Sequence, residues 1–350
     1  MKKINDNEKN VSMRDLARLA EVSIATVSRV LNSPELVTEE TRERVLKAAT
    51  ELNYMPNRLA QSLRTRRSKI VGLVVPDVIN PIYTELVEII QKQFDELGYS
   101  LILCESGENA KKELNYLRLL QGWNADGIII APVAKTEIAS PIWKAVSGKL
   151  IQLSRYVPGI SSGVILSDNY GGAWKATNHL VNLGYKRIAM IGGPMAVNTA
   201  RDRTGGYYKA LCDAGISLSS EYEVHGVFSE NEGYNAIKRL MTIEPLPEAI
   251  FCCSNLLTVG ALMALKDAGI RIPNDIAFVS FDDLNTGSIL NPPLTCVAQR
   301  MGDIGKGAVR LIMEMIEKKS IQNNVEIVPT DLIIRESCGR LLEKRPKVFR

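Results

Sequence analysis

From residue 70 onward, short apolar runs alternate with stretches in which apolar residues recur every three to four positions, and this alternation constrains the fold most. The strand-like runs are 70–75, 101–104, 127–131, 150–153, 164–166, 187–191, 223–228, 249–253, 276–281 and 295–298. The stretches with helical spacing are 83–97, 174–183, 206–214, 256–268 and 304–316. Alternating strands and helices are typical of parallel sheets covered by helices on both faces. Ten strands divide most naturally into two doubly wound sheets, so we expect an α/β body with two of them.

The residues before this alternation predict a bundle of short helices. Ser12 and Asp15 have the spacing of a capping box, Ser23 precedes a helix over 24–31, and Thr38 precedes a third helix that begins with two glutamates. The apolar residues expected on the helix faces that form the core are Leu16, Ala17, Leu19 and Ala20, then Val27, Val30 and Leu31, then Val45, Leu46, Ala49 and Leu52. We therefore expect an all-α head with a core of its own.

The first two helices of this head are separated by a short turn, which is the helix-turn-helix arrangement. On the second helix, Arg29 has the reach for a guanine edge or a phosphate, and Ile24 and Ala25 suit apolar contact with a thymine methyl group. The candidate DNA contacts are Ser23, Ile24, Ala25, Thr26, Ser28 and Arg29, of which Thr26 and Ser28 suit phosphates. A solvated polar face on an ordinary three-helix bundle explains these residues about equally well.

Charge is concentrated in the head and the segment that follows it. Residues 1–69 carry 14 Lys and Arg against 9 Asp and Glu, whereas the whole chain has a net charge of only +4. Residues 57–69 contain five bases and no acid, and Leu59 and Leu63 lie on one face of a short helix that Asn57 caps. Leucines in this arrangement suit the DNA minor groove, where they wedge between base steps beside the same helix from a second copy of the chain. The alternative is that this segment is a basic flexible tether. The candidate contacts in this segment are Asn57, Arg58, Ala60 and Leu63.

Several long motifs, in order along the chain, resemble the lactose-repressor/galactose-repressor (LacI/GalR) family of bacterial transcription regulators. They are 13–17, 22–32, 54–60, 72–77, 168–172, 281–283 and 291–295. The resemblance implies a periplasmic-binding-protein-like body with three crossovers near residues 168, 298 and 330, a small effector between its subdomains, and a homodimer on a near-palindromic DNA operator. The ranges it implies are a head over 1–56, a hinge helix or linker over 57–69, a core over 70–340 and a basic tail over 341–350. Within the core, one subdomain comprises 70–167 and 299–329, and the other 168–298 and 330–340.

The family's effector contacts match polar and aromatic residues that follow strand ends, where ligands of doubly wound sheets bind. The resemblance places them at Tyr83, Arg155, Asp168, Arg203, Phe228, Asn255, Asp282 and Gln299. Ordinary roles remain open: Arg203 as a helix cap, for example. The chain departs from the family in having Ser154 where many members have Asp, and Leu256 after Asn255 where many have Asp. With Arg201 also near, three arginines favour a sugar acid or sugar phosphate over a plain sugar.

Other classes of protein are less consistent with the sequence. No run approaches the roughly 20 apolar residues of a membrane span, and the polar N-terminus lacks a signal-peptide core, so we expect a cytoplasmic protein rather than a secreted solute-binding protein. A nucleotide-dependent enzyme is disfavoured because neither a Gly-x-Gly-x-x-Gly motif nor a P-loop is present. With two histidines and six cysteines outside any Cys-x-x-Cys pair, we expect buried thiols, no metal and no cofactor. The C-terminal tail lacks the leucine heptads of a coiled coil, which favours a dimer over a dimer of dimers. The sequence also leaves open that the effector is a protein co-regulator rather than a metabolite.

Overall fold

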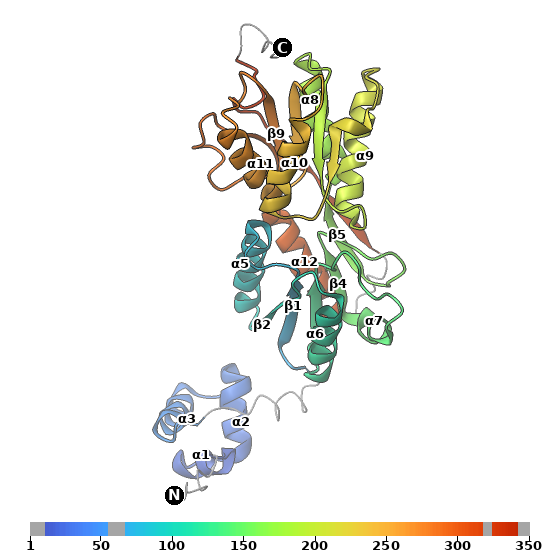
Figure 1. The fold of residues 1–350 in the computed structure, drawn as a ribbon. Coiled ribbons are helices and arrows are strands. Elements are labelled where there is room, and N and C mark those ends of the chain that lie inside the picture. Colours follow the sequence, from blue (N-terminus) through green and yellow to red (C-terminus); the bar gives the residue numbers. More distant parts are fainter. Residues whose placement is uncertain (1–10, 55–66, 318–323, 342–350) are drawn as a thin grey trace, which may run out of the picture. The chain divides into compact units, whose positions relative to one another are not determined.

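The computed structural model describes residues 11–54, 67–317 and 324–341 (Figure 1). The chain divides into two compact units, Met1–Ser68 and Lys69–Arg350.

The first unit is a small helical bundle: α1 (Met13–Leu19), α2 (Ile24–Asn32), the 3-10 turn η1 (Pro34–Leu36) and α3 (Glu39–Glu51). All three predicted caps are confirmed, because Ser12, Ser23 and Thr38 each accept a hydrogen bond from the backbone N–H three residues on. The Ser12 bond is one half of a capping box, in which the Asp15 side chain also accepts a hydrogen bond from the Ser12 backbone N–H.

The core of this unit is centred on Leu16, Val27 and Val45, which are fully buried. The prediction that Leu19 and Leu46 belong to this core is wrong, because Leu19 is 42% exposed and Leu46 is 45% exposed. Leu46 lies about 100° around the helix from Val45, and Ala48 takes the inward position. Leu19 is the last residue of the short helix α1, so the core contact passes to Ala20.

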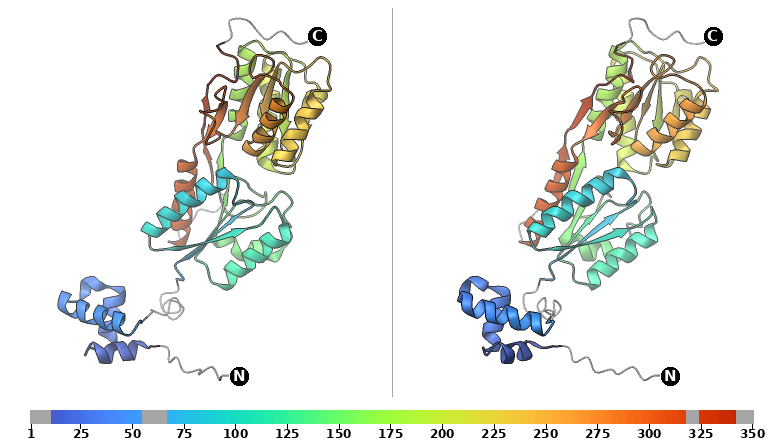
Figure 2. Two further views of the ribbon diagram at one scale, coloured as in Figure 1. Left: turned by 60° about the vertical axis from the view of Figure 1, so that its left-hand side comes forward. Right: turned by 90° about the vertical axis from the view of Figure 1, so that its left-hand side faces the viewer.

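The second unit contains two sheets, as predicted (Figures 1 and 2). Each has six strands, so the described residues form twelve strands rather than the ten predicted. The first has the strand order β11-β5-β4-β3-β1-β2 and the second β12-β10-β9-β8-β6-β7. The strands of the first are β1 (Ile70–Val75), β2 (Ser100–Glu105), β3 (Gly127–Ile130), β4 (Leu150–Leu153), β5 (Gly163–Ser167) and β11 (Val325–Val328). Those of the second are β6 (Ile188–Gly192), β7 (Glu223–His225), β8 (Ala249–Cys252), β9 (Ala277–Phe281), β10 (Thr295–Gln299) and β12 (Thr330–Ile333). Pairing is parallel throughout except between β10 and β12, which are antiparallel.

Helices cover both faces of the first sheet. One face packs on α5 (Pro81–Glu96) and α12 (Met301–Ile316), and the other on α6 (Ala110–Gly122) and α7 (Pro141–Val146) (Figure 2). The alternation of Leu73 and Val74 along β1 shows this, since Leu73 lies in the core on the α5 side and Val74 in the core on the α6 side. The 3-10 turn η2 (Ser147–Lys149) contacts both α7 and α12.

The helices of the second sheet pack in two pairs. Helix α8 (Asn169–Asn182) contacts α9 (Asn198–Asp213), and α10 (Glu230–Leu240) contacts α11 (Asn255–Asp267); the turn η3 (Ser220–Tyr222) precedes β7. Glycines permit the close approach of the second pair: a Cβ at Gly260 would lie 1.7 Å from the Glu230 carbonyl oxygen. The predicted strand over 223–228 is too long, because β7 ends at His225.

The chain passes between the two sheets three times: from β5 to α8, from β10 to α12, and from β11 to β12. Of the six cysteines, all within the described residues and all free, five are buried as expected, and only Cys212 is exposed. Among the described helices, none has the length and apolar character that a bilayer span requires.

Candidate functional site

Helix α2 presents a mixed apolar and basic surface on the side away from the head's core. Ile24 is 45% exposed at the first turn, and Ala25 and Arg29 are exposed on the same helix. Ser23 and Thr26 have a second role, since the Ser23 hydroxyl accepts from the Thr26 backbone N–H at 3.0 Å and lies 2.8 Å from the Thr26 hydroxyl. An exposed isoleucine beside a helix N-terminus and an arginine suits contact with the floor and walls of a DNA groove.

The predicted contacts in the basic segment, Asn57, Arg58, Ala60 and Leu63, lie outside the described residues. Their roles stay predictions.

In the second unit, a pocket lies where the carboxyl ends of strands from both sheets meet. Its lining residues are Asn80, Ile82, Tyr83, Ser154, Arg155, Thr199, Arg203, Phe228, Ser254, Asn255, Asp282 and Gln299. The structure thus brings together seven of the eight predicted effector contacts, Asp168 excepted. The Asp168 carboxylate caps helix α8 by accepting from the Gly171 N–H at 2.8 Å.

On the first-sheet side of the pocket, Arg155 is buried beside a carboxylate. Its Nη1 donates to Glu108 Oε1 at 2.7 Å and to the Pro132 carbonyl at 3.4 Å. Its guanidinium carbon lies 5.8 Å from the centre of the Phe228 ring. Burial by itself lowers the pKa of Arg155, but the hydrogen-bonded Glu108 carboxylate opposes this effect and the pKa is raised overall. This arginine is therefore fixed as a cation.

On the second-sheet side, Arg203 and Asp282 form a buried pair with 3.8 Å between Nη1 and Oδ2. Arg203 Nε donates to Asn169 Oδ1 at 2.8 Å, and Nη1 donates to the Cys253 carbonyl at 2.5 Å. The guanidinium carbon lies 3.7 Å from the centre of the Phe281 ring. The pair is thus held by a hydrogen-bonded shell, which is what a buried charge requires.

The carboxylate of Asp282 connects this pair to two further pocket residues. Its Oδ1 accepts from Gln299 Nε2 at 2.5 Å, and its Oδ2 accepts from the Asn255 N–H at 3.3 Å. Asp282 itself has φ 76°, a left-handed conformation that non-glycine residues seldom adopt. Burial raises the pKa of Tyr83 on the opposite wall, so its hydroxyl stays neutral.

Hydrogen bonds around this pocket join the two halves of the second unit, each of which is built on one of the two sheets. Asn255 Nδ2 donates to Asn80 Oδ1 at 2.9 Å, and the Tyr156 N–H donates to Asn198 Oδ1 at 3.2 Å. The cavity there measures about 50 Å³. It is smaller than the roughly 300–1,000 Å³ typical of pockets that hold small molecules.

Two expectations about this pocket need correction or addition. Arg201 is not near the pocket: its Nη1 donates to the carbonyls of Met195 and Ala196 at 3.1 and 3.0 Å, because it lies two residues from Arg203 on α9 and faces another way. Glu108 was missed, although it follows the end of β2 and the same rule about polar residues after strands identifies it. Thr199, in the first turn of α9, was also missed, although Arg203 on the same helix was predicted.

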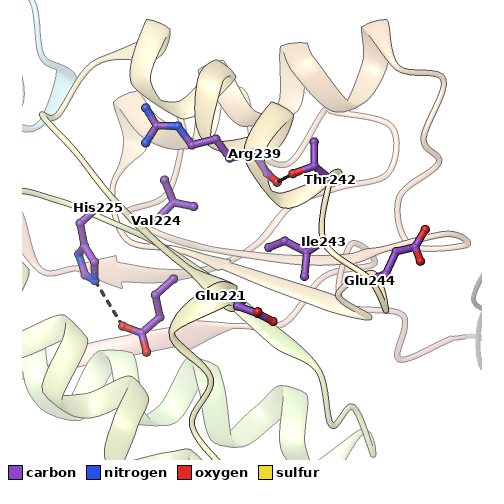
Figure 3. Close-up of a pocket in the computed structure, with 8 residues that line it drawn as sticks. Glu221, Val224, His225, Arg239, Thr242, Ile243 and Glu244 are labelled. Carbon is purple, nitrogen blue, oxygen red and sulfur yellow. Dashed lines mark hydrogen bonds and ion pairs between the residues drawn. The ribbon is translucent and has the colours of Figure 1, made fainter.

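A larger depression of about 500 Å³ lies at the open edge of the second sheet, beside β7 (Figure 3). Three of its side chains have charged or hydrogen-bonding partners: Glu223 accepts from the Tyr208 hydroxyl at 2.5 Å and lies 3.6 Å from His225 Nε2, and Arg239 lies 3.7 Å from Glu232. Among the described residues, no group of three or more His, Cys, Asp or Glu side chains is placed to hold a metal ion.

Comparisons with known proteins follow the same division of the chain. Residues 12–57 match the family described as bacterial regulatory proteins, lacI family, and residues 68–336 match periplasmic binding proteins and sugar binding domain of LacI family.

Relatives of known function match over nearly the whole chain. The chain is 32% identical over 335 residues to the HTH-type transcriptional repressor PurR of Haemophilus influenzae (strain PittEE), covering 95% of this chain and 99% of the relative. It is also 32% identical over 330 residues to the ribose operon repressor of Haemophilus influenzae (strain ATCC 51907 / DSM 11121 / KW20 / Rd), covering 94% and 99%. A solved structure of the lac repressor dimer bound to operator and the anti-inducer ONPF superposes with a TM-score of 0.82 at 26% identity, covering 94% of this chain and 99% of that one.

Proposed function

The chain belongs to the LacI family of bacterial regulatory proteins, and from that membership we propose that it is a sequence-specific DNA-binding transcriptional repressor controlled by a small molecule. The observation that carries the proposal is the joining, in one chain, of a helix-turn-helix head to a two-sheet body whose pocket lies between the sheets. The relatives are repressors rather than enzymes, and we assign no catalytic activity to the chain. Action on DNA places the protein in the cytoplasm.

In the head, α2 is the element that enters the major groove. Ile24 and Ala25 contact base edges by apolar surface, and Arg29 reaches a guanine or a phosphate. A homodimer presents two such helices to the half-sites of a near-palindrome, which the lac repressor dimer on its operator supports. The domain ranges 1–56, 57–69, 70–340 and 341–350 belong to this proposal.

In the body, the effector is a sugar, a sugar acid or a sugar phosphate. It is held by Tyr83, Arg155, Arg203, Phe228, Asn255, Asp282 and Gln299. The eighth predicted contact, Asp168, caps α8 and does not line the pocket. Ligand binding changes the relation of the halves, and the change reaches the segment 57–69. The coupling free energy comes from the difference in effector affinity between the DNA-binding and the released state.

The proposal is tested by selection of random duplex DNA with the full-length protein. We expect enrichment of a near-palindrome, and an affinity for it that falls steeply with salt because phosphate contacts release counterions. Arg29→Ala weakens this binding, whereas Arg44→Ala, which removes an equal charge from the exposed side of α3, changes it much less. Absence of enrichment over random duplex would contradict the function.

The paired-hinge part of the proposal has its own test. Leu63→Ala removes the side chain assigned to the minor-groove wedge and should lower both operator affinity and DNA bending. Unchanged affinity and bending would show that residues 57–69 serve only as a tether.

A further inference from the structure

The two arginines of the pocket are already neutralised by carboxylates of the protein. Arg155 lies 2.7 Å from Glu108, and Arg203 lies 3.8 Å from Asp282. The four groups together carry no net charge. An anionic ligand would therefore bring an uncompensated negative charge into a space with buried walls, which is unfavourable unless a carboxylate leaves or binds a proton.

Two of the three guanidinium nitrogens of Arg203 also donate to the protein, which limits the capacity of this residue to bind a carboxylate or phosphate. The acceptors are Asn169 and the Cys253 carbonyl, and the guanidinium carbon lies 3.7 Å from the centre of the Phe281 ring. A bidentate grip on an anion needs two adjacent N–H groups aimed at the ligand. Arg203 is arranged to hold the protein's own groups in place.

The Ser154 hydroxyl differs from these satisfied groups. Ser154 lines the pocket, is only 9% exposed, and its Oγ has no hydrogen-bond partner among the described residues. Buried polar groups are bonded in the great majority of cases. Its φ of 59° also lies in the left-handed region, as does that of Asp282 on the other side of the pocket. Strained non-glycine residues cluster at ligand sites, so two independent observations mark Ser154 as a ligand-binding group.

A flat apolar wall completes this part of the pocket. The Phe228 ring packs so closely on Gly193 that a Cβ there would lie 2.2 Å from the ring. The ring is thus held from behind and offers its other side to the pocket that it lines. Such a wall suits the apolar face of a sugar ring or a flat heterocycle.

We propose that the effector is an uncharged molecule bearing a hydroxyl or amide group, and that Ser154 is the residue that recognises this group. The inference rests on the proposed function, since it concerns the same pocket. It narrows the ligand classes expected from the sequence to those without a charge. It also gives a role to Glu108, which positions Arg155 and excludes anions.

The test compares matched ligand pairs on the full-length protein by thermal unfolding and calorimetric titration. The pairs are D-ribose and D-ribose 5-phosphate, D-glucose and D-glucuronate, and inosine and inosine 5′-monophosphate. We expect an uncharged member to raise the melting temperature by mass action, and its anionic partner to bind at least tenfold more weakly. A tighter anionic partner overturns the proposal, and so does a panel in which no uncharged member binds.

Variants separate recognition from stability. Ser154→Ala should weaken the uncharged ligand about tenfold, the value of one hydrogen bond, whereas the control Ser147→Ala, outside the pocket, leaves it unchanged. Glu108→Gln, which keeps the shape but removes the charge opposite Arg155, should shift the preference within a pair about tenfold toward the anion. An unaffected Ser154→Ala variant, or no shift in preference for Glu108→Gln, overturns the assignment. If operator selection still succeeds in either case, the ligand class is wrong while the DNA-binding function stands.

Discussion

Replacement of Arg203 by methionine tests whether the buried charge pair organises the pocket. The change keeps an unbranched side chain beside Phe281 but leaves the Asp282 carboxylate, 3% exposed, without its cation. It also leaves Asn169 Oδ1 and the Cys253 carbonyl without the donors they now have. Removing one partner of a buried pair costs about 3–5 kcal/mol, and in a domain of this size about 1 kcal/mol shifts Tm by roughly 2–4 °C. We therefore expect the body to unfold at a temperature lower by about 6–20 °C.

The second half of this prediction is a double-mutant cycle measured by urea unfolding. Asp282→Asn in the Arg203→Met background removes the unpaired charge, so the double variant should be more stable than the sum of the single losses implies, by about 1–3 kcal/mol. The reasoning is refuted if Arg203→Met costs less than about 1 kcal/mol, or if the two losses simply add.

Three further perturbations follow from single contacts. Gly260→Ala should lower the free energy of unfolding in urea by about 1–3 kcal/mol, because its Cβ would meet the Glu230 carbonyl oxygen at 1.7 Å. The control Gly122→Ala, whose Cβ would have no atom within 4 Å, should raise the free energy of unfolding by up to about 1 kcal/mol. Changes of the same sign in both variants would contradict the packing of α10 on α11. Burial raises the pKa of Glu113 to about 7, so the folded protein keeps a proton that the unfolded chain releases. Stability should then fall as pH rises from the ordinary glutamate pKa to about 7, by at most about 1.4 kcal/mol per unit, and Glu113→Gln should flatten that slope in unfolding measured across this range. Ser23→Ala should lower the free energy of unfolding of the head by about 1 kcal/mol, because α2 loses its N-cap. The measurement is the unfolding transition of the head, followed by the circular dichroism signal of its helices. An unchanged midpoint of this transition would mean that the cap is dispensable.

The sequence predicted the strands that form continuous buried runs, and the reason is physical. Strands inside a parallel sheet are covered on both faces and read as unbroken apolar segments, as β3 and β8 do. Strands β11 and β12 lie at the sheet edges, where Val325 and Ile327 are exposed, so they lack that signal. Leu46 shows the same limit in a helix, since apolar character alone does not fix which side faces the core.

Most of the pocket was predictable because its side chains follow strand ends, but the residues alone did not select among many such candidates. The resemblance to a family made that selection, and the structure brings seven of those residues together. Charge balance was not predictable in this way, because Glu108 and Arg155 are 47 residues apart and their contact depends on which strands are neighbours. Arg201 seemed equivalent to Arg203 in sequence, yet helical geometry turns it away.

The coupling between the two sites tests the central claim most directly. Operator affinity of the full-length protein is measured by fluorescence anisotropy on the selected duplex, with increasing amounts of the compound that most raises the melting temperature. We predict a change of about 5–150-fold in operator affinity, and an equal change in affinity for the compound when operator is present. A compound and an operator that both bind, each without effect on the other, would contradict the account.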